Sequence, residues 1–299
     1  MLFAGASPAC RAKLLRCMPS AAALLLVLLG TIASGDEVAK ATFLKEYAEG
    51  EKKLAEAYSH VVISATATEQ QTPKQPATVS IVHYRSSGPM LRVETDASGI
   101  NERGPYTRRF VRVCNPGKDS FTADWNAFAD GFVLTGTHPD PQSLAETIRL
   151  HCPFARPAHG FFEVTVRELL AFEGVEVERF ERIDVAGKSL AKLTTSQKMR
   201  DGRVISSYRT FTFDPSRHWA LVEYTFGLTP DRQAATTCQI EYSASAKGVP
   251  LVKSMRRWHI AKDGTRDQQM TVEVHSIEVK ELPDADFTLT AFGIPTPPK

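Results

Sequence analysis

The stretch 203–227, RVISSYRTFTFDPSRHWALVEYTFG, decides the fold class of this chain. Apolar and polar side chains alternate within 203–213 and within 218–227. Both segments are rich in β-branched and aromatic residues, which is typical of half-buried strands. The turn signal Asp214-Pro215 stands between them. The stretch therefore predicts two antiparallel strands joined by a tight connection.

Runs with the same two-residue period continue on both sides of this pair. They fall at 61–68, 78–84, 90–96, 108–114, 119–124, 176–185, 189–199, 236–245, 251–261 and 267–280. Turn signals such as Ala186-Gly187 and Asp263-Gly264 separate them, and no strand–helix–strand alternation occurs. We expect a mainly β (α+β) fold, in which about eleven strands form one strongly curved antiparallel half-barrel.

One amphipathic helix is predicted before the first strand, over 37–59. Apolar or small residues recur there at steps of three and four. They are Phe43, Tyr47, Gly50, Leu54 and Ala57. We expect the helix to pack its apolar side on the concave face of the sheet.

A second helical region interrupts the strands at 136–172. Prolines mark loops in this excursion, and Ser143 with Glu146 has the spacing of a capping box for a short helix to about Leu150. Another short helix is expected over 164–172. These helices are also predicted to lie on the concave face.

The first 35 residues have the layout of a secretory signal peptide. Basic residues precede an apolar run at 21–29, and small residues follow up to Gly35. The run is shorter than the ~20 residues that a spanning helix needs, so we favour cleavage near Gly35 over an uncleaved anchor. We expect a periplasmic or secreted protein with no stable transmembrane anchor, one domain at 36–294 and a Pro-rich tail at 295–299.

The charge balance gives no reason to expect nucleic acid as a partner. The chain has 36 Lys and Arg against 34 Asp and Glu, and the first 35 residues contain three of the basic residues and no acidic one. The mature chain therefore carries a formal charge of −1, without the basic excess that phosphate backbones require.

Three cysteines remain after cleavage, namely Cys114, Cys152 and Cys238. Because three is an odd number, one thiol stays unpaired, and the sequence allows all three pairings. We favour a Cys114–Cys152 disulfide, since it would tie a strand to the Pro-rich excursion. Cys238 instead alternates with apolar residues on a predicted inner strand face.

Three motifs resemble the LolA and LppX-like superfamily of periplasmic lipoprotein carriers. The stretch SGPMLRVE at 87–94 is similar to a family motif in which Arg92 falls on the family's arginine. The segment from FTFDP at 211–215 to Tyr224 is similar to the family's central hairpins. LPDADFTL at 282–289 is similar to its closing motif, where a phenylalanine plugs the sheet. The mature chain is longer than a typical carrier, mostly through 136–185.

The resemblance implies a half-barrel that holds an acyl chain beneath a helical lid, with Arg92 bonded to lid carbonyls. We therefore expect a non-enzymatic protein that binds a lipid or lipidated group. The helix 37–59 and the middle helices would form a movable lid, with ligand contacts from Phe43, Tyr47 and Leu54. The alternative is an RseB-like envelope sensory or interaction module, with a filled core and an envelope protein as partner.

No motif for catalysis, cofactor or metal binding is found. The chain has no Gly-x-Ser-x-Gly, no His-Glu-x-x-His and no glycine-rich phosphate loop after a strand. The nearest histidine cluster, His151-Cys152 with His159, lies among prolines. An enzyme with its site on the loops of 136–172 remains a third hypothesis.

A basic patch, Arg256-Arg257-Trp258-His259, lies on a predicted strand. It could meet lipid headgroups or an acidic partner, but strand alternation also allows its residues to form an ordinary solvated face.

Overall fold

The computed structural model describes residues 35–101, 103–158, 165–198, 204–227, 235–243 and 248–295. The predicted signal peptide up to residue 34, His159 and the tail from residue 296 lie outside these residues. The chain divides into two units, Met1–Ala41 and Thr42–Lys299. Of the first unit only the beginning of one helix is described, whereas the second contains every described strand.

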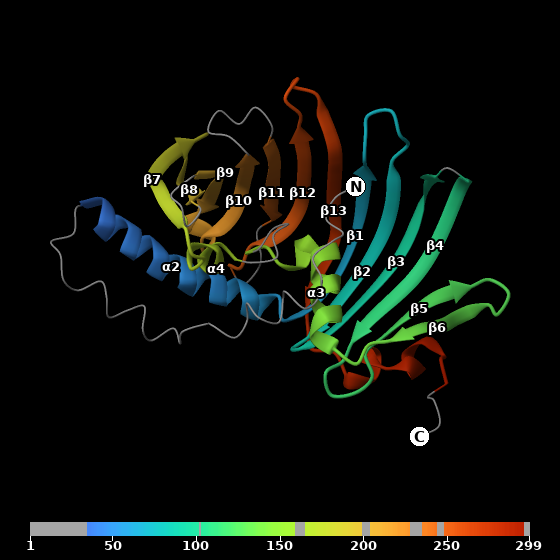
Figure 1. The fold of residues 1–299 in the computed structure, drawn as a ribbon. Coiled ribbons are helices and arrows are strands. Elements are labelled where there is room, and N and C mark those ends of the chain that lie inside the picture. Colours follow the sequence, from blue (N-terminus) through green and yellow to red (C-terminus); the bar gives the residue numbers. More distant parts are fainter. Residues whose placement is uncertain are drawn as a thin grey trace. The chain divides into compact units, whose positions relative to one another are not determined.

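One antiparallel sheet of thirteen strands contains all the described strands (Figure 1). The bounds are β1 (His60–Gln70), β2 (Thr78–Ser87), β3 (Met90–Asn101), β4 (Gly104–Cys114), β5 (Phe121–Asn126), β6 (Gly131–Thr137), β7 (Val175–Val185), β8 (Lys188–Lys198), β9 (Val204–Asp214), β10 (Ala220–Gly227), β11 (Ala235–Ser243), β12 (Leu251–Ile260) and β13 (Arg266–Val279). The sheet is strongly curved and open, so the predicted half-barrel is confirmed.

The strand order is β6-β5-β4-β3-β2-β1-β13-β12-β11-β10-β9-β8-β7. Two meanders therefore meet where β1 pairs with β13, for example Val61 with Val279. Strand β6 was not predicted: no strand was expected between residue 124 and the excursion at 136. The apolar run after Asp130-Gly131 was the signal for it.

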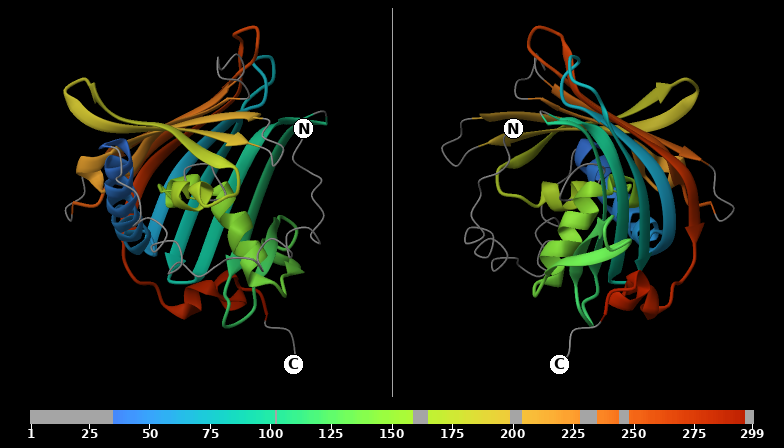
Figure 2. Two further views of the ribbon diagram at one scale, coloured as in Figure 1. Left: turned by 60° about the vertical axis from the view of Figure 1, so that its left-hand side comes forward. Right: turned by 90° about the vertical axis from the view of Figure 1, so that its right-hand side faces the viewer.

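The topology explains why a helical excursion follows β6. Strands β6 and β7 lie at opposite edges of the sheet, so the chain between them has to cross it. It does so through α3 (Pro141–His151), the 3₁₀ turn η2 (Pro153–Ala155) and α4 (Val166–Leu170). Together with α2 (Gly35–Ala57) from Thr42 onwards, these elements cover the concave face, as predicted (Figure 2).

The capping residues of the two middle helices differ from the prediction. Asp140 caps α3, where its Oδ1 accepts hydrogen bonds from the amides of Gln142 at 3.1 Å and Ser143 at 3.4 Å. The predicted box at Ser143 is wrong, because Pro141 already begins the helix. A capping box forms at α4 instead: Thr165 Oγ1 accepts from the Glu168 amide, and the Glu168 carboxylate accepts from the Thr165 amide.

Two apolar cores occupy the two faces of the sheet. The larger one joins α2, α3 and α4 to the concave face, with Ile63, Leu193 and Phe211 fully buried. The smaller one lies on the opposite face of β4 and β5. There Phe287, at the end of the 3₁₀ turn η4 (Asp284–Phe287), packs with Val111 and Phe121. The C-terminal segment therefore covers a patch that would otherwise be exposed.

The predicted Cys114–Cys152 disulfide is not formed. Cys114, Cys152 and Cys238 are all buried free thiols. Cys114 Sγ donates to the carbonyl of Pro141 at 3.1 Å, which places it at the first residue of α3. Cys152 follows the last residue of the same helix, and at 1.5 Å per residue α3 separates the two positions by about 16 Å. A disulfide needs Cα atoms within about 7 Å.

Candidate functional site

The first part of α2 within Thr42–Lys299 packs into a solid aromatic core. The Phe43 ring centroid lies 4.7 Å from that of Phe180, 5.6 Å from that of Phe213 and 5.1 Å from that of Trp219. Phe43 and Tyr47 each retain 2% of their surface exposed. Such offset and edge-on ring contacts stabilise a core beyond the area they bury. This end of the helix leaves no room for a ligand.

The second part of α2 instead borders a cleft of about 370 Å³. Its lining comes from α2, from strands β2 and β3, and from the chain that follows α3. The residues are Glu51, Leu54, Ala55, Tyr58, Ser59, Tyr84, Ser86, Gly88, Leu91, Arg149, Ala155, Arg156, Pro157 and Ala158. About half of the lining surface is apolar. The volume of the cleft is at the lower end of the range of small-molecule sites, about 300–1,000 Å³.

The end of α2 is held at the cleft by a buried hydrogen-bond network. The Tyr58 hydroxyl donates to the carbonyl of Pro250 at 3.3 Å and accepts from the amide of Val252 at 2.8 Å. Ser86 Oγ donates to the carbonyl of Tyr58 at 3.0 Å and accepts from the amide of Val61 at 3.2 Å. One wall of the cleft is therefore fixed to β2 and β12.

Two arginines and one carboxylate, that of Glu51, are the charged residues of the cleft lining. Arg149 lies in the last turn of α3, and Arg156 follows η2. Burial lowers the pKa of the Arg156 guanidinium, and the nearby charge of Arg149 lowers it further. Burial raises the pKa of the Tyr84 phenol, while both arginines lower it. An anionic group placed among these three side chains would be stabilised by two positive charges and a hydroxyl donor.

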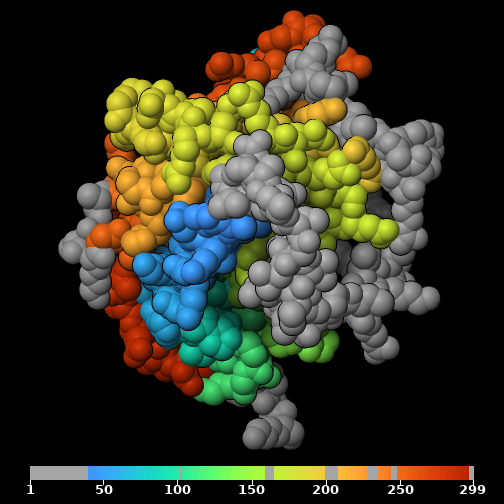
Figure 3. Space-filling view, turned by 90° about the vertical axis from the view of Figure 1, so that its left-hand side faces the viewer, coloured from blue at the N-terminus to red at the C-terminus, as the bar shows by residue number. Residues whose placement is uncertain are grey.

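The lining residue Glu51 forms a partly buried ion pair that joins α2 to α4. Arg167 Nε lies 3.0 Å from Glu51 Oε2, and the side chain of Glu51 is 11% exposed against 58% for Arg167. Glu51 lines the cleft. The pair therefore joins α4 to the wall that α2 forms. In Figure 3 the solvent side of α2 is blue and lies between atoms coloured yellow and teal.

The structure separates the four predicted ligand residues. Leu54 lines the cleft, and Phe43 and Tyr47 belong to the aromatic core. Arg92 lies on the opposite face of the sheet, because its neighbours Leu91 and Val93 point into the concave core. It does donate to a backbone carbonyl, at 2.9 Å, but this is the carbonyl of Asp286 in the C-terminal segment and not one of the lid.

Sequence reasoning missed Tyr84, Arg149 and Arg156. Tyr84 alternates with Val82 on the inner face of β2, so its burial was predictable. The arginines carried no such signal, since they belong to the excursion and meet Tyr84 only after the chain has crossed the sheet.

Among the described residues, no group of three or more His, Cys, Asp or Glu is arranged to hold a metal ion. No described helix is long and apolar enough to span a membrane.

No family model and no curated protein matches the chain. Solved structures do match it. A lipoprotein-sorting protein domain from Vibrio parahaemolyticus is 9% identical, with a TM-score of 0.41 over 82% of this chain and 96% of that one. A DUF1329 family protein from Desulfovibrio piger is 8% identical, with a TM-score of 0.36 over 83% and 98%. Lipoprotein LppX from Mycobacterium tuberculosis is 11% identical, with a TM-score of 0.31 over 80% and 99%.

The structures matched are of the kind that the three sequence motifs resemble, so the predicted resemblance is confirmed. At these identities and TM-scores, the likeness carries no argument about the ligand, the partner or the site of this chain.

Proposed function

We propose that this protein binds an anionic amphiphile, an acyl chain with an acidic group, in the cleft between α2 and the chain after α3. One observation carries the proposal: the lining of the cleft combines apolar side chains with a group formed by Tyr84, Arg149 and Arg156. Each buried methylene contributes about 0.8 kcal/mol, so a partly buried chain supplies affinity while the arginines select an acidic head. Such a binding protein would act in the periplasm or outside the cell, without catalysing a reaction.

The binding mode differs from a lid that opens over the whole concave face. The aromatic core around Phe43 fills one part of that face, and the Tyr58 network holds the end of α2. The ligand would therefore occupy the cleft alone, and α2 would stay in place.

The test is displacement of a fluorescent fatty acid from the purified protein. Ala55 is exposed and lines the cleft, so Ala55→Trp should obstruct it and weaken binding about tenfold or more. Glu49→Trp adds the same ring at an exposed position of α2 outside the cleft lining and should leave affinity within about twofold. Arg149→Gln with Arg156→Gln should weaken binding of the acid but not of its methyl ester. Equal affinities for all variants would contradict the proposal.

A protein-interaction module is the second candidate, because the aromatic core beneath α2 is filled and not hollow. It predicts no uptake of any acyl probe by the unmodified protein. It also predicts co-purification of one envelope protein with the full chain. Saturable fatty-acid binding that Ala55→Trp removes would exclude this alternative.

A further inference from the structure

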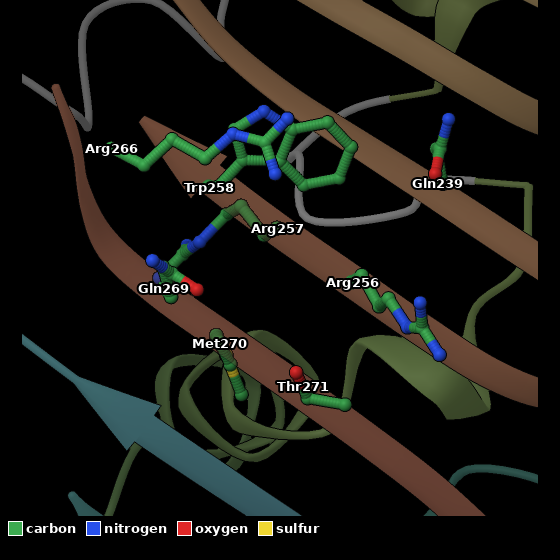
Figure 4. Close-up of a pocket in the computed structure, with 8 residues that line it drawn as sticks. All are labelled: Gln239, Arg256, Arg257, Trp258, Arg266, Gln269, Met270 and Thr271. Atoms are coloured by element: carbon green, nitrogen blue, oxygen red, sulfur yellow. The ribbon is translucent and has the colours of Figure 1, made fainter. Parts of the chain in front are cut away.

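Strands β12 and β13 carry a groove of about 470 Å³ on the sheet face opposite the concave core (Figure 4). Its lining residues are Gln239, Arg256, Arg257, Trp258, Arg266, Gln269, Met270 and Thr271. Met255 and Val272 are fully buried in the concave core. Strand alternation therefore turns Arg256 and Thr271, which pair across the two strands, toward the other face. It turns the neighbouring pair, Arg257 and Met270, toward the concave side, where Met270 packs against the core.

The charged residues that line this groove are all positive. Its lining contains arginines and no carboxylate. Within the described part of the chain, neither Arg256 nor Arg266 forms an ion pair. The guanidinium carbon of Arg266 lies 5.3 Å from the centroid of the Trp258 ring, as the overlapping side chains in Figure 4 illustrate. Glu223, on the neighbouring strand β10, accepts a hydrogen bond from Gln239 Nε2 at 2.9 Å and does not pair with Arg256.

Hydrogen-bond donors accompany the positive charges. The indole Nε1 of Trp258 is buried and has no acceptor among the described residues. The hydroxyl of Thr271 and the amide of Gln269 lie along the same groove. Guanidinium groups present paired N–H donors that match the oxygens of a phosphate, and stacking on an aromatic ring limits the orientations of Arg266.

We propose that this groove binds the phosphate group of a small, soluble organic phosphate, held by Arg266 beside Trp258, with Arg256 farther along the same groove. The observations favour a soluble ligand over a membrane headgroup. No large apolar side chain of β11 or β12 is among the exposed ones, and the groove is bordered by polar residues such as Thr237. A bilayer would find no exposed large apolar side chain of β11 or β12 to bury beside the groove. The site is separate from the acyl cleft and does not depend on it.

The test is a titration of the purified chain with glycerol 3-phosphate and with inorganic phosphate, followed by tryptophan fluorescence and calorimetry. Saturable binding by the unmodified protein is expected. The double variant Arg256→Gln, Arg266→Gln should bind about tenfold more weakly or not at all. The matched control Lys253→Gln, Lys262→Gln removes two positive charges from the same strand and its hairpin, outside the groove lining. Its affinity should stay within about twofold.

Two further measurements keep the proposal open to refutation. Circular dichroism and thermal unfolding establish that each variant is folded, and Trp258→Phe should remove the fluorescence change without removing the calorimetric binding. Absence of saturable binding, or equal loss in both double variants, would overturn the proposal. Binding to phosphatidylglycerol vesicles but not to glycerol 3-phosphate, lost only in the arginine variant, would overturn the soluble ligand in favour of a lipid headgroup.

Discussion

The two parts of α2 that follow Thr42 show how one helix can serve both stability and binding. Around Phe43 it packs against rings from β7, from β9 and from the turn before β10. Around Leu54 and Ala55 it faces a cleft, although the same sheet lies opposite. The difference arises from what enters the concave face: aromatic side chains at one end, and the small residues Ala155 and Ala158 at the other. We infer that a ligand binds at the second end of α2, because no large side chain fills the space there.

The largest effect is expected from Phe43→Ala. Removing a buried ring from this cluster should lower the free energy of unfolding by about 3–5 kcal/mol. Chemical denaturation measures the loss. The matched control is Phe128→Ala, at a fully exposed position (103%), which should change stability by no more than about 0.5 kcal/mol. Similar losses for both variants would show that α2 is not packed as described.

The next effect tests how closely α2 approaches the backbone at His218. A Cβ on Gly50 would clash with the carbonyl oxygen of His218. Gly50→Ala should therefore destabilise the protein by about 1–3 kcal/mol through overpacking. In an exposed helix the same substitution stabilises by up to about 1 kcal/mol, so the sign of the change is decisive. A stabilised variant in the denaturation experiment would refute the close contact.

A smaller effect is expected at the rim of the cleft. Arg167→Gln leaves the nearly buried carboxylate of Glu51 without its cation. Because Arg167 is itself more than half exposed, water screens the pair, and we expect a loss of about 1 kcal/mol. Lys52→Gln, which removes a solvent-exposed partner of Glu56, should cost less than about 0.5 kcal/mol. Indistinguishable unfolding curves for the two variants would mean that α4 is not held by this contact.

The smallest effect concerns the buried thiols. Burial raises the pKa of Cys238 to about 12 and also raises the pKa of Cys152, so neither forms a reactive thiolate at pH 8. An aromatic disulfide reagent should label neither thiol in the folded chain and all three mature thiols in denaturant. Cys152 raises the pKa of Tyr84, which lines the cleft, whereas Cys238 lies on β11, outside the cleft lining. Slow selective labelling of Cys152 would show that the cleft end opens. Fewer than three thiols in denaturant would indicate a disulfide.

Local sequence patterns anticipated much of the fold. The two-residue period located twelve of the thirteen strands, and the three- and four-residue steps located α2 and its buried side, including Phe43 and Tyr47. These predictions succeeded because burial of one face imposes a period that neighbouring residues already display. Strand β6 was missed because two glycines and a short length weaken its pattern.

The site could not be predicted to the same extent. Leu54 was expected at the ligand and lines the cleft, but Arg92 was expected there and lies across the sheet at Asp286. Arg149 and Arg156 reach Tyr84 only because the excursion crosses from edge to edge. A contact between residues so far apart along the chain leaves no periodic trace in the sequence around either one.

The class of the fold, the strands and the apolar side of α2 therefore follow from local sequence, because each depends on the alternation of neighbouring residues. The three-dimensional structure was needed to show that β1 pairs with β13, that the cysteines on either side of α3 stay apart, and where the concave face is filled or open. Those features depend on which distant side chains arrive at one place and how much volume they occupy. The strand period and the spacing of residues do not show which distant side chains will meet.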